Sequence, residues 1–347
     1  MISKLRYLFL VLASFCFVLG MSLPAQAEDV YKVKVAHEDI TEAPVHLAFE
    51  LFKELAEKRS DGRLQITIYP NETLGTNRET IESAQLGAIQ MLRTPSGVLA
   101  PFVPEMALLD IPFMFNSYDE ARTTVESPDL KKFMADACAK KGIVFFGYYE
   151  QGFRNITNSK KSIWKLEDLK GLKLRTMEAP LHMTNFKALG ASPTPMAWGE
   201  LFTALQQGVV DGQENPFYVI IDAKFPEVQS YMSITNHIYD AFPNLASKKW
   251  WDKLPADLQK ILVDCMEESR IYQYSINKGD NDNGLMEILA IPTMKVNAVP
   301  PEELAKFKEI GQAAVKEELY KRLGKETVDW WVKRVDEIVA EVRANQL

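Results

Sequence analysis

The chain has 347 residues, of which 47% are hydrophobic and 25% are charged, and its formal net charge is −7. These values are ordinary for a folded globular protein, and they exclude a disordered, collagen-like or disulfide-dense chain. No basic stripe occurs, which argues against a nucleic-acid partner. The length favours about two domains.

The N-terminus has the pattern of an export signal. Two basic residues precede an apolar run over residues 7–20, and Ala25 and Ala27 follow it in an A-x-A arrangement. The run is shorter than the roughly 20 residues that span a membrane. We therefore predict a signal peptide over residues 1–27, cleavage after Ala27, and a periplasmic mature chain.

The mature chain keeps two cysteines, Cys138 and Cys265. An oxidising compartment would permit a disulfide between them. Both lie among apolar neighbours in helical patterns, so we expect two separate buried thiols.

Strand and helix patterns alternate from residue 31 onward. Alternating apolar residues predict strands over residues 31–36 and 63–69, and helical spacing predicts a helix over residues 44–59 between them. A helix over residues 76–88 and a buried strand over residues 142–148 follow. This order is typical of an α/β layer architecture.

The same alternation begins again after Gly152, and no flexible Gly/Ser linker precedes it. We expect strands, and not a tether, to join the two α/β units. This second part has helix patterns over residues 181–189, 198–207, 256–290, 301–322 and 326–344. The helix pattern over residues 256–290 is weak at its centre.

Motifs that carry catalysis are absent from the sequence. It contains no dinucleotide-binding, P-loop, zinc-protease, serine-hydrolase or C-x-x-C motif. None of the 4 histidines is paired at a metal-binding spacing. We therefore expect neither an enzyme nor a cofactor. His37 and Glu38 end a predicted strand, where open α/β sheets face ligand crevices, so both are site candidates.

Three blocks carry a resemblance to a known family. They are L-G-T-N-R-E at residues 74–79, E-D-L-K-G-L-K-L-R at residues 167–175 and G-V-V-D-G-Q-E-N-P at residues 208–216. In this order, behind an export signal, they resemble the solute-binding proteins of tripartite ATP-independent periplasmic (TRAP) transporters, in the C4-dicarboxylate-binding branch. The resemblance covers nearly the whole mature chain.

The resemblance implies a two-lobed α/β periplasmic binding protein fold, with a ligand cleft between the lobes and a long helix spanning both. It places residues 28–151 and about 241–280 in lobe I, and residues 152–240 and about 281–347 in lobe II. The expected partners are a small-molecule carboxylate and the small and large membrane subunits of the transporter.

The resemblance also implies roles for individual residues. In that family the arginine that ends the G-L-K-x-R strand binds the substrate carboxylate, and here it is Arg175. Arg154 supports the same group, Asn215 donates an amide, and Trp198 packs on the ligand. The other candidates are His37, Glu38, Asn77, Ser96 and His237.

The chemistry of these residue types is consistent with those roles. A guanidinium binds a carboxylate through two parallel hydrogen bonds. Each of three residues also has an alternative role that does not involve a ligand. Arg154 could form a surface ion pair, Asn215 could be a turn residue before a proline, and Trp198 could be an ordinary core residue.

The solute also stays open, since sugar acids, C4-dicarboxylates and larger organic acids all fit. Trp198, Met177, Tyr148 and Tyr149 disfavour the smallest diacids, and the hydroxyl-binding candidates favour a sugar acid such as a uronate by a narrow margin. Two alternatives are a binding protein that feeds a membrane sensor and an exported enzyme acting on a carboxylated substrate.

Overall fold

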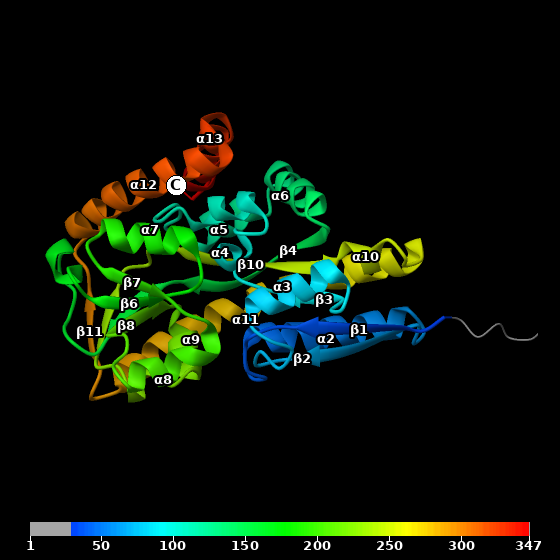
Figure 1. Ribbon diagram of the computed structural model, residues 1–347, viewed down its shortest axis with the longest axis horizontal. Coiled ribbons are helices and arrows are strands. Elements are labelled where there is room, and N and C mark those ends of the chain that lie inside the picture. The colour runs from blue at the N-terminus through cyan, green and yellow to red at the C-terminus, as the bar shows by residue number, and fades with distance from the viewer. Residues whose placement is uncertain (1–28, 347) are drawn as a thin grey trace, which may run out of the picture.

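The computed structural model describes residues 29–346, which form two lobes side by side (Figure 1). The predicted signal peptide lies outside the described residues. Within them, no helix combines the length and the apolar character needed to cross a membrane.

Lobe I is built on a five-stranded sheet in the order β2-β1-β3-β10-β4. Its strands are β1 (Tyr31–Ala36), β2 (Leu64–Tyr69), β3 (Met91–Arg93), β4 (Ile143–Phe153) and β10 (Tyr239–Ser247). The first three run parallel because helices carry the chain back between them, whereas β10 arrives from the second half of the chain and pairs antiparallel with β3 and β4. The helices of this lobe are α2 (Pro44–Arg59), α3 (Asn77–Leu86), α4 (Ser96–Leu99), η1 (Pro104–Asp110), α5 (Tyr118–Val125), α6 (Pro128–Lys140) and α10 (Lys248–Trp251).

Lobe II is built on a six-stranded sheet in the order β11-β9-β5-β8-β6-β7. Its strands are β5 (Asn155–Asn158), β6 (Lys173–Thr176), β7 (Ser192–Pro195), β8 (Gly212–Asn215), β9 (Tyr231–Ile234) and β11 (Lys295–Ala298). A Cβ on Gly212 would lie 2.2 Å from the Thr157 carbonyl oxygen, so the close approach of β8 to β5 requires glycine there. The helices of this lobe are η2 (Leu166–Leu169), α7 (Pro180–Ala188), η3 (Trp198–Glu200), α8 (Leu201–Gln206), α9 (Phe217–Asp222) and η4 (Phe225–Glu227).

The chain passes between the lobes through regular structure, as expected. Strand β4 is followed directly by β5 of the other sheet, and β9 leads back into β10. Helix α11 (Ala256–Ala290) then packs on α2 and β4 in lobe I and on α9 in lobe II, so it spans both (Figure 1).

The weak centre predicted for this helix is a buried polar row. Ser269, Gln273, Asn277 and Asn281 recur every four residues on the buried face. Gln273 exchanges hydrogen bonds with the backbone of Glu150, and Asn281 donates to the Gln151 carbonyl. Because β4 is the edge strand of its sheet, these side chains replace a neighbouring strand as backbone partners.

Two further helices, α12 (Pro301–Leu323) and α13 (Lys325–Ala344), cross the top of the molecule in Figure 1. Helix α12 packs on α7 of lobe II, whereas α13 packs on α5 of lobe I. Trp331 of α13 is buried in the core cluster that holds Leu130 and Met134. The resemblance assigned residues about 281–347 to lobe II, and the lobe boundaries stay a prediction.

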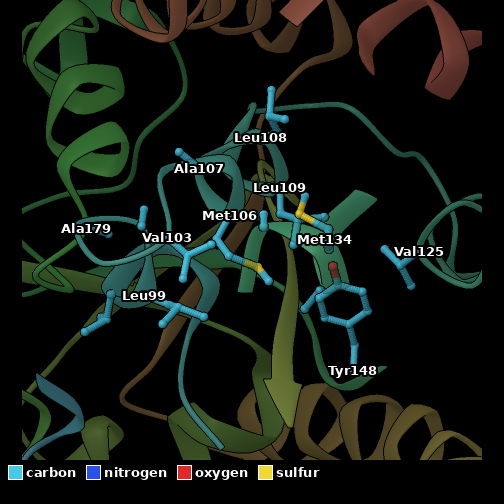
Figure 2. Close-up of a cluster of buried hydrophobic side chains, with 14 of the residues drawn as sticks. Leu99, Val103, Met106, Ala107, Leu108, Leu109, Val125, Met134, Tyr148 and Ala179 are labelled. Atoms are coloured by element: carbon cyan, nitrogen blue, oxygen red, sulfur yellow. The ribbon is translucent and has the colours of Figure 1, made fainter. Parts of the chain in front are cut away.

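The cores of the molecule settle two expectations about side chains. Cys138 and Cys265 are buried free thiols in different clusters, which confirms the prediction of separate thiols. Figure 2 shows Tyr148 pointing into an apolar cluster with Met134 and Val125. Tyr149 belongs to another core cluster. Neither tyrosine lines the pocket described below, whereas Trp198 and Met177 do. Only the use of the two tyrosines to judge solute size was therefore wrong.

Candidate functional site

A pocket with about 1050 Å³ of empty space, part of it open to solvent, lies between the two lobes. It lies beyond the carboxyl ends of parallel strands β1 and β6, where ligands bind in open α/β sheets. Five of the predicted site residues line it: Arg175, Asn215, Trp198, Glu38 and Asn77.

Arg175 is the only cationic side chain among the described residues that line the pocket. Its Nε and Nη2 donate to the Met196 carbonyl at 3.1 and 2.8 Å, and within the described chain no carboxylate forms an ion pair with it. Burial and the neighbouring Arg154 lower its pKa to about 10. The guanidinium is therefore a buried charge without a counter-ion.

Arg154, by contrast, is saturated by carboxylates. It forms ion pairs with Glu214 and Asp240, and its Nη2 donates to Glu214 Oε1 at 3.0 Å. Its side chain is fully buried and does not line the pocket. The structure thus places Arg154 behind Arg175, and it does not bring the two guanidinium groups to one pocket wall.

Asn215 and Trp198 complete the lobe II wall. Asn215 ends β8, beside β6, and its Nδ2 donates to Gln213 Oε1 at 2.5 Å, which leaves its second amide hydrogen for another acceptor. The Trp198 ring centroid lies 5.9 Å from Arg175 Cζ, within the range of a cation–π contact. Trp198 also packs on a core cluster of this lobe, so its core and pocket roles coexist.

The lobe I wall is acidic. Asn77 donates to Glu38 Oε2, and it is held at the first turn of α3 by a capping box between Thr76 and Glu79. Burial and the adjacent Asp39 raise the pKa of Glu38 to about 7. This wall therefore offers carboxylate oxygens to whatever occupies the pocket.

Three other candidates lie away from the pocket lining. His37 Nε2 is hydrogen-bonded to His46 Nδ1 at 3.1 Å, and the His37 ring stacks on Phe49. Ser96 donates to Asp110 at 3.0 Å, while its neighbour Pro95 lines the pocket in its place. His237 is buried with its Nε2 3.1 Å from Glu214. As with Arg154, hydrogen bonds within the protein occupy the polar atoms that the predicted ligand contacts needed.

The pocket also contains residues that sequence reasoning missed. Asp39 accepts from Arg93 Nη1 at 2.5 Å and from Gln151 Nε2 at 2.9 Å. Although burial opposes it, the Arg93 guanidinium holds the pKa of Asp39 below its usual value. The sequence did contain a signal for Arg93, because a charged residue that directly follows the apolar pair Met91-Leu92 indicates a functional position at a strand end. No local pattern marks Gln151.

The two lobes touch across the mouth of the pocket. Glu72 of lobe I accepts a hydrogen bond at 3.1 Å from the backbone nitrogen of Gly199 in lobe II. Ala43 of lobe I is buried in one small apolar cluster with Tyr218 and Val219 of lobe II. The structure is therefore a closed form, in which the two lobes touch beside the pocket.

A buried ionic cluster joins the lobes behind the pocket. His182 lies 3.7 Å from Asp110 of lobe I and 3.5 Å from Glu214 of lobe II, distances of ion pairs without hydrogen bonds. Burial opposes the charged imidazole, but the two carboxylates outweigh it and raise the pKa of His182 to about 9. In the described chain, no group of His, Cys, Asp and Glu is arranged to hold a metal ion.

Comparisons with known proteins agree with this arrangement. Residues 35–322 match the family described as bacterial extracellular solute-binding protein, family 7. The chain is 33% identical over 311 residues to the C4-dicarboxylate-binding periplasmic protein DctP of Rhodobacter capsulatus, which covers 89% of this chain and 92% of that one.

Two solved structures extend the match to three dimensions. The sugar acid binding protein DctPAm of Advenella mimigardefordensis, in complex with galactonate, gives a TM-score of 0.84 at 34% identity over 89% of this chain and 99% of that chain. A TRAP periplasmic solute-binding protein of Sulfurospirillum deleyianum with bound succinate gives 0.82 at 28% identity over 89% and 99%. The two-lobed fold and the resemblance are thereby confirmed. The chain belongs to the family 7 bacterial extracellular solute-binding proteins, the binding proteins of TRAP transporters.

Proposed function

We propose that this protein captures a carboxylate-bearing solute in the periplasm and delivers it to the small and large membrane subunits of a TRAP transporter. The observation that carries the proposal is the state of Arg175. It is a buried guanidinium on the pocket wall with no carboxylate partner among the described residues. A solute carboxylate supplies the missing counter-ion.

In this proposal, Arg175 and the residues around it contact different parts of the solute. Arg175 holds the carboxylate, and Asn215 adds an amide hydrogen bond from the neighbouring strand. Trp198 packs on the apolar part of the solute. Arg154 and His237 act from behind the wall, because their hydrogen bonds to Glu214 fix the strand that carries Asn215.

The energetics of these contacts are sufficient for useful affinity. Hydrogen bonds to charged groups contribute about 1.5–3 kcal/mol each. A micromolar dissociation constant needs about 8 kcal/mol. Two bonds from Arg175, one from Asn215 and apolar contact with Trp198 reach that value after ordering costs.

A thermal-shift screen of residues 28–347 against organic acids tests the proposal. A ligand at about 1,000 times its dissociation constant adds about 4 kcal/mol of stability, which gives a clear shift. We expect hits that disappear in Arg175→Ala. Arg78→Ala is the matched control, because the Arg78 side chain is 57% exposed and lies outside the pocket lining. A hit that survives Arg175→Ala would contradict the assignment of the site.

Closure of the lobes provides the coupling to transport. Closing without a solute buries the unpaired Arg175 charge, which is unfavourable, so a carboxylate shifts the population toward the closed form. We expect the radius of gyration from small-angle scattering to fall when a hit from the screen is added. An unchanged radius would show that the solute does not drive closure.

Export is the remaining part of the proposal. The A-x-A pattern at Ala25 and Ala27 and the names of the periplasmic relatives support it. Mass spectrometry of the protein recovered from a periplasmic extract is expected to give a chain that begins at Glu28. A full-length mass would contradict cleavage after Ala27.

A further inference from the structure

Among the described residues, the lobe I wall of the pocket has three carboxylates and no unpaired cation. Glu38, Asp39 and Glu72 line it, whereas Arg175 belongs to lobe II. Arg93 does not line the pocket. Its Nη1 donates to Asp39, and its Cζ lies 3.8 Å from the centroid of the ring of Phe242, which does line it. Since the charges of Asp39 and Arg93 neutralise each other, Glu38 and Glu72 determine the charge of this wall.

Both glutamates keep oxygens that lack a donor from the described chain. Glu72 Oε2 accepts from Gly199, but its Oε1 is buried without a hydrogen-bond partner there. Only one oxygen of Glu38 is engaged, by Asn77. A solute that brings donors to this wall satisfies the free oxygen of Glu38 and the negative charge of both glutamates, and so it stabilises the closed form.

We propose that Glu38 and Glu72 select the solute by its far end. The pocket accepts a monocarboxylate whose far end carries hydroxyl groups, such as an aldonate or a uronate, and it rejects a dicarboxylate. This inference rests on the proposed function, in which Arg175 holds the single carboxylate.

The discrimination follows from hydrogen-bond chemistry and charge. A hydroxyl donates to a carboxylate oxygen in a charge-assisted hydrogen bond. Above the Glu38 pKa of about 7, a second carboxylate has no proton to donate and enters a desolvated wall beside two groups of its own charge. Size does not make the distinction, because an aldonate and the aldarate of the same sugar have nearly the same volume.

A matched pair of probes isolates this effect. D-galactonate and galactarate, like D-gluconate and D-glucarate, differ only in whether the far carbon is a hydroxymethyl group or a carboxylate. We would titrate each, together with succinate, into residues 28–347 in a calorimeter. We expect the aldonate of at least one pair to bind about tenfold or more tightly than its aldarate.

Two substitutions of similar shape assign the effect to its residues. Glu38→Gln and Glu72→Gln remove a charge and keep the side-chain size. In each, we expect the aldonate-to-aldarate affinity ratio to fall about tenfold. Glu42→Gln is the matched control, since Glu42 is an exposed acid of the same lobe outside the pocket lining, and it should leave the ratio unchanged. Circular dichroism melts confirm that each variant is folded.

The outcomes separate this inference from the proposed function. Aldarates or succinate that bind the wild type as tightly as the aldonates, and that are lost in Arg175→Ala, overturn the selection by Glu38 and Glu72 and leave the proposed function intact. A Glu42→Gln effect as large as that of Glu38→Gln also overturns it, because the discrimination is then a long-range charge effect. Binding that survives Arg175→Ala overturns the proposed function and this inference with it.

Discussion

Replacing each buried arginine by methionine should lower the stability of the ligand-free protein to very different extents. Arg175→Met removes a buried charge that has no counter-ion within the described chain. Arg154→Met leaves the buried Asp240 without an ion-pair partner in the described chain, and it leaves Glu214 with its histidine contacts alone. The two positions are equally buried, so the comparison isolates the ionic environment.

The expected magnitudes follow from the geometry. A fall in the Arg175 pKa to about 10 reflects an unfavourable interaction of the charged form on the order of 3 kcal/mol. Losing the two charge-assisted hydrogen bonds to Met196 costs about 1.5–3 kcal/mol each, which cancels or exceeds this gain. Arg175→Met should therefore destabilise the free protein by at most about 3 kcal/mol. Arg154→Met should destabilise it by about 3–5 kcal/mol.

The assay is urea unfolding of protein that has been denatured, dialysed and refolded, so that no co-purified solute contributes. The Arg154→Met midpoint should fall clearly further than the Arg175→Met midpoint, with similar slopes. The Arg175 variant should in addition bind no organic acid. If both variants lose stability to the same extent, Arg175 is a structural residue and the reasoning about its unpaired charge is refuted.

Three further predictions concern stability. The folded pKa of His182 is raised from 6.5 to about 9, so the stability from its ion pairs is complete below about pH 6.5 and is lost as the pH rises through 9. The melting temperature should therefore fall over this range, and His182→Gln should make the fall less steep; an unchanged slope would exclude His182 as its source. Gly284→Ala places a Cβ 2.8 Å from the Tyr218 backbone nitrogen and should destabilise the protein by about 1–3 kcal/mol, whereas Gly279→Ala on the same helix meets nothing within 4 Å and should stabilise it by about 0.5–1 kcal/mol; urea midpoints that move together would contradict this. Thr76→Ala removes the cap of α3 and should lower the free energy of unfolding by about 1 kcal/mol, and an unchanged urea midpoint would show that the cap is dispensable.

The sequence predicted the fold and one side of the pocket better than the other. The alternating strands and helices, the joining strands and the long helix depend on local periodicity, and the structure has them all. Arg175 and Asn215 end neighbouring strands of one sheet, so motif position alone brought them to the same edge.

The other side depends on contacts that local patterns do not encode. Asp39 meets Gln151 across 112 positions of the chain, and Glu72 reaches Gly199 across 127. His37 was expected at the pocket because it ends a strand, but its ring turns to His46, nine positions on. Which polar atoms are already satisfied inside the protein is decided by tertiary packing, and that is the information the sequence lacked.

The two walls of the pocket also have a consequence for how such a protein changes over generations. In the proposed function, the arginine that binds the carboxylate stands on one sheet, and Glu38, Asp39 and Glu72 stand on segments of the other lobe. Substitutions in the short segments around residues 38, 72 and 151 can alter what is taken up while the anchor stays intact. A descendant protein can therefore come to bind a different organic acid while it keeps the ability to bind carboxylates.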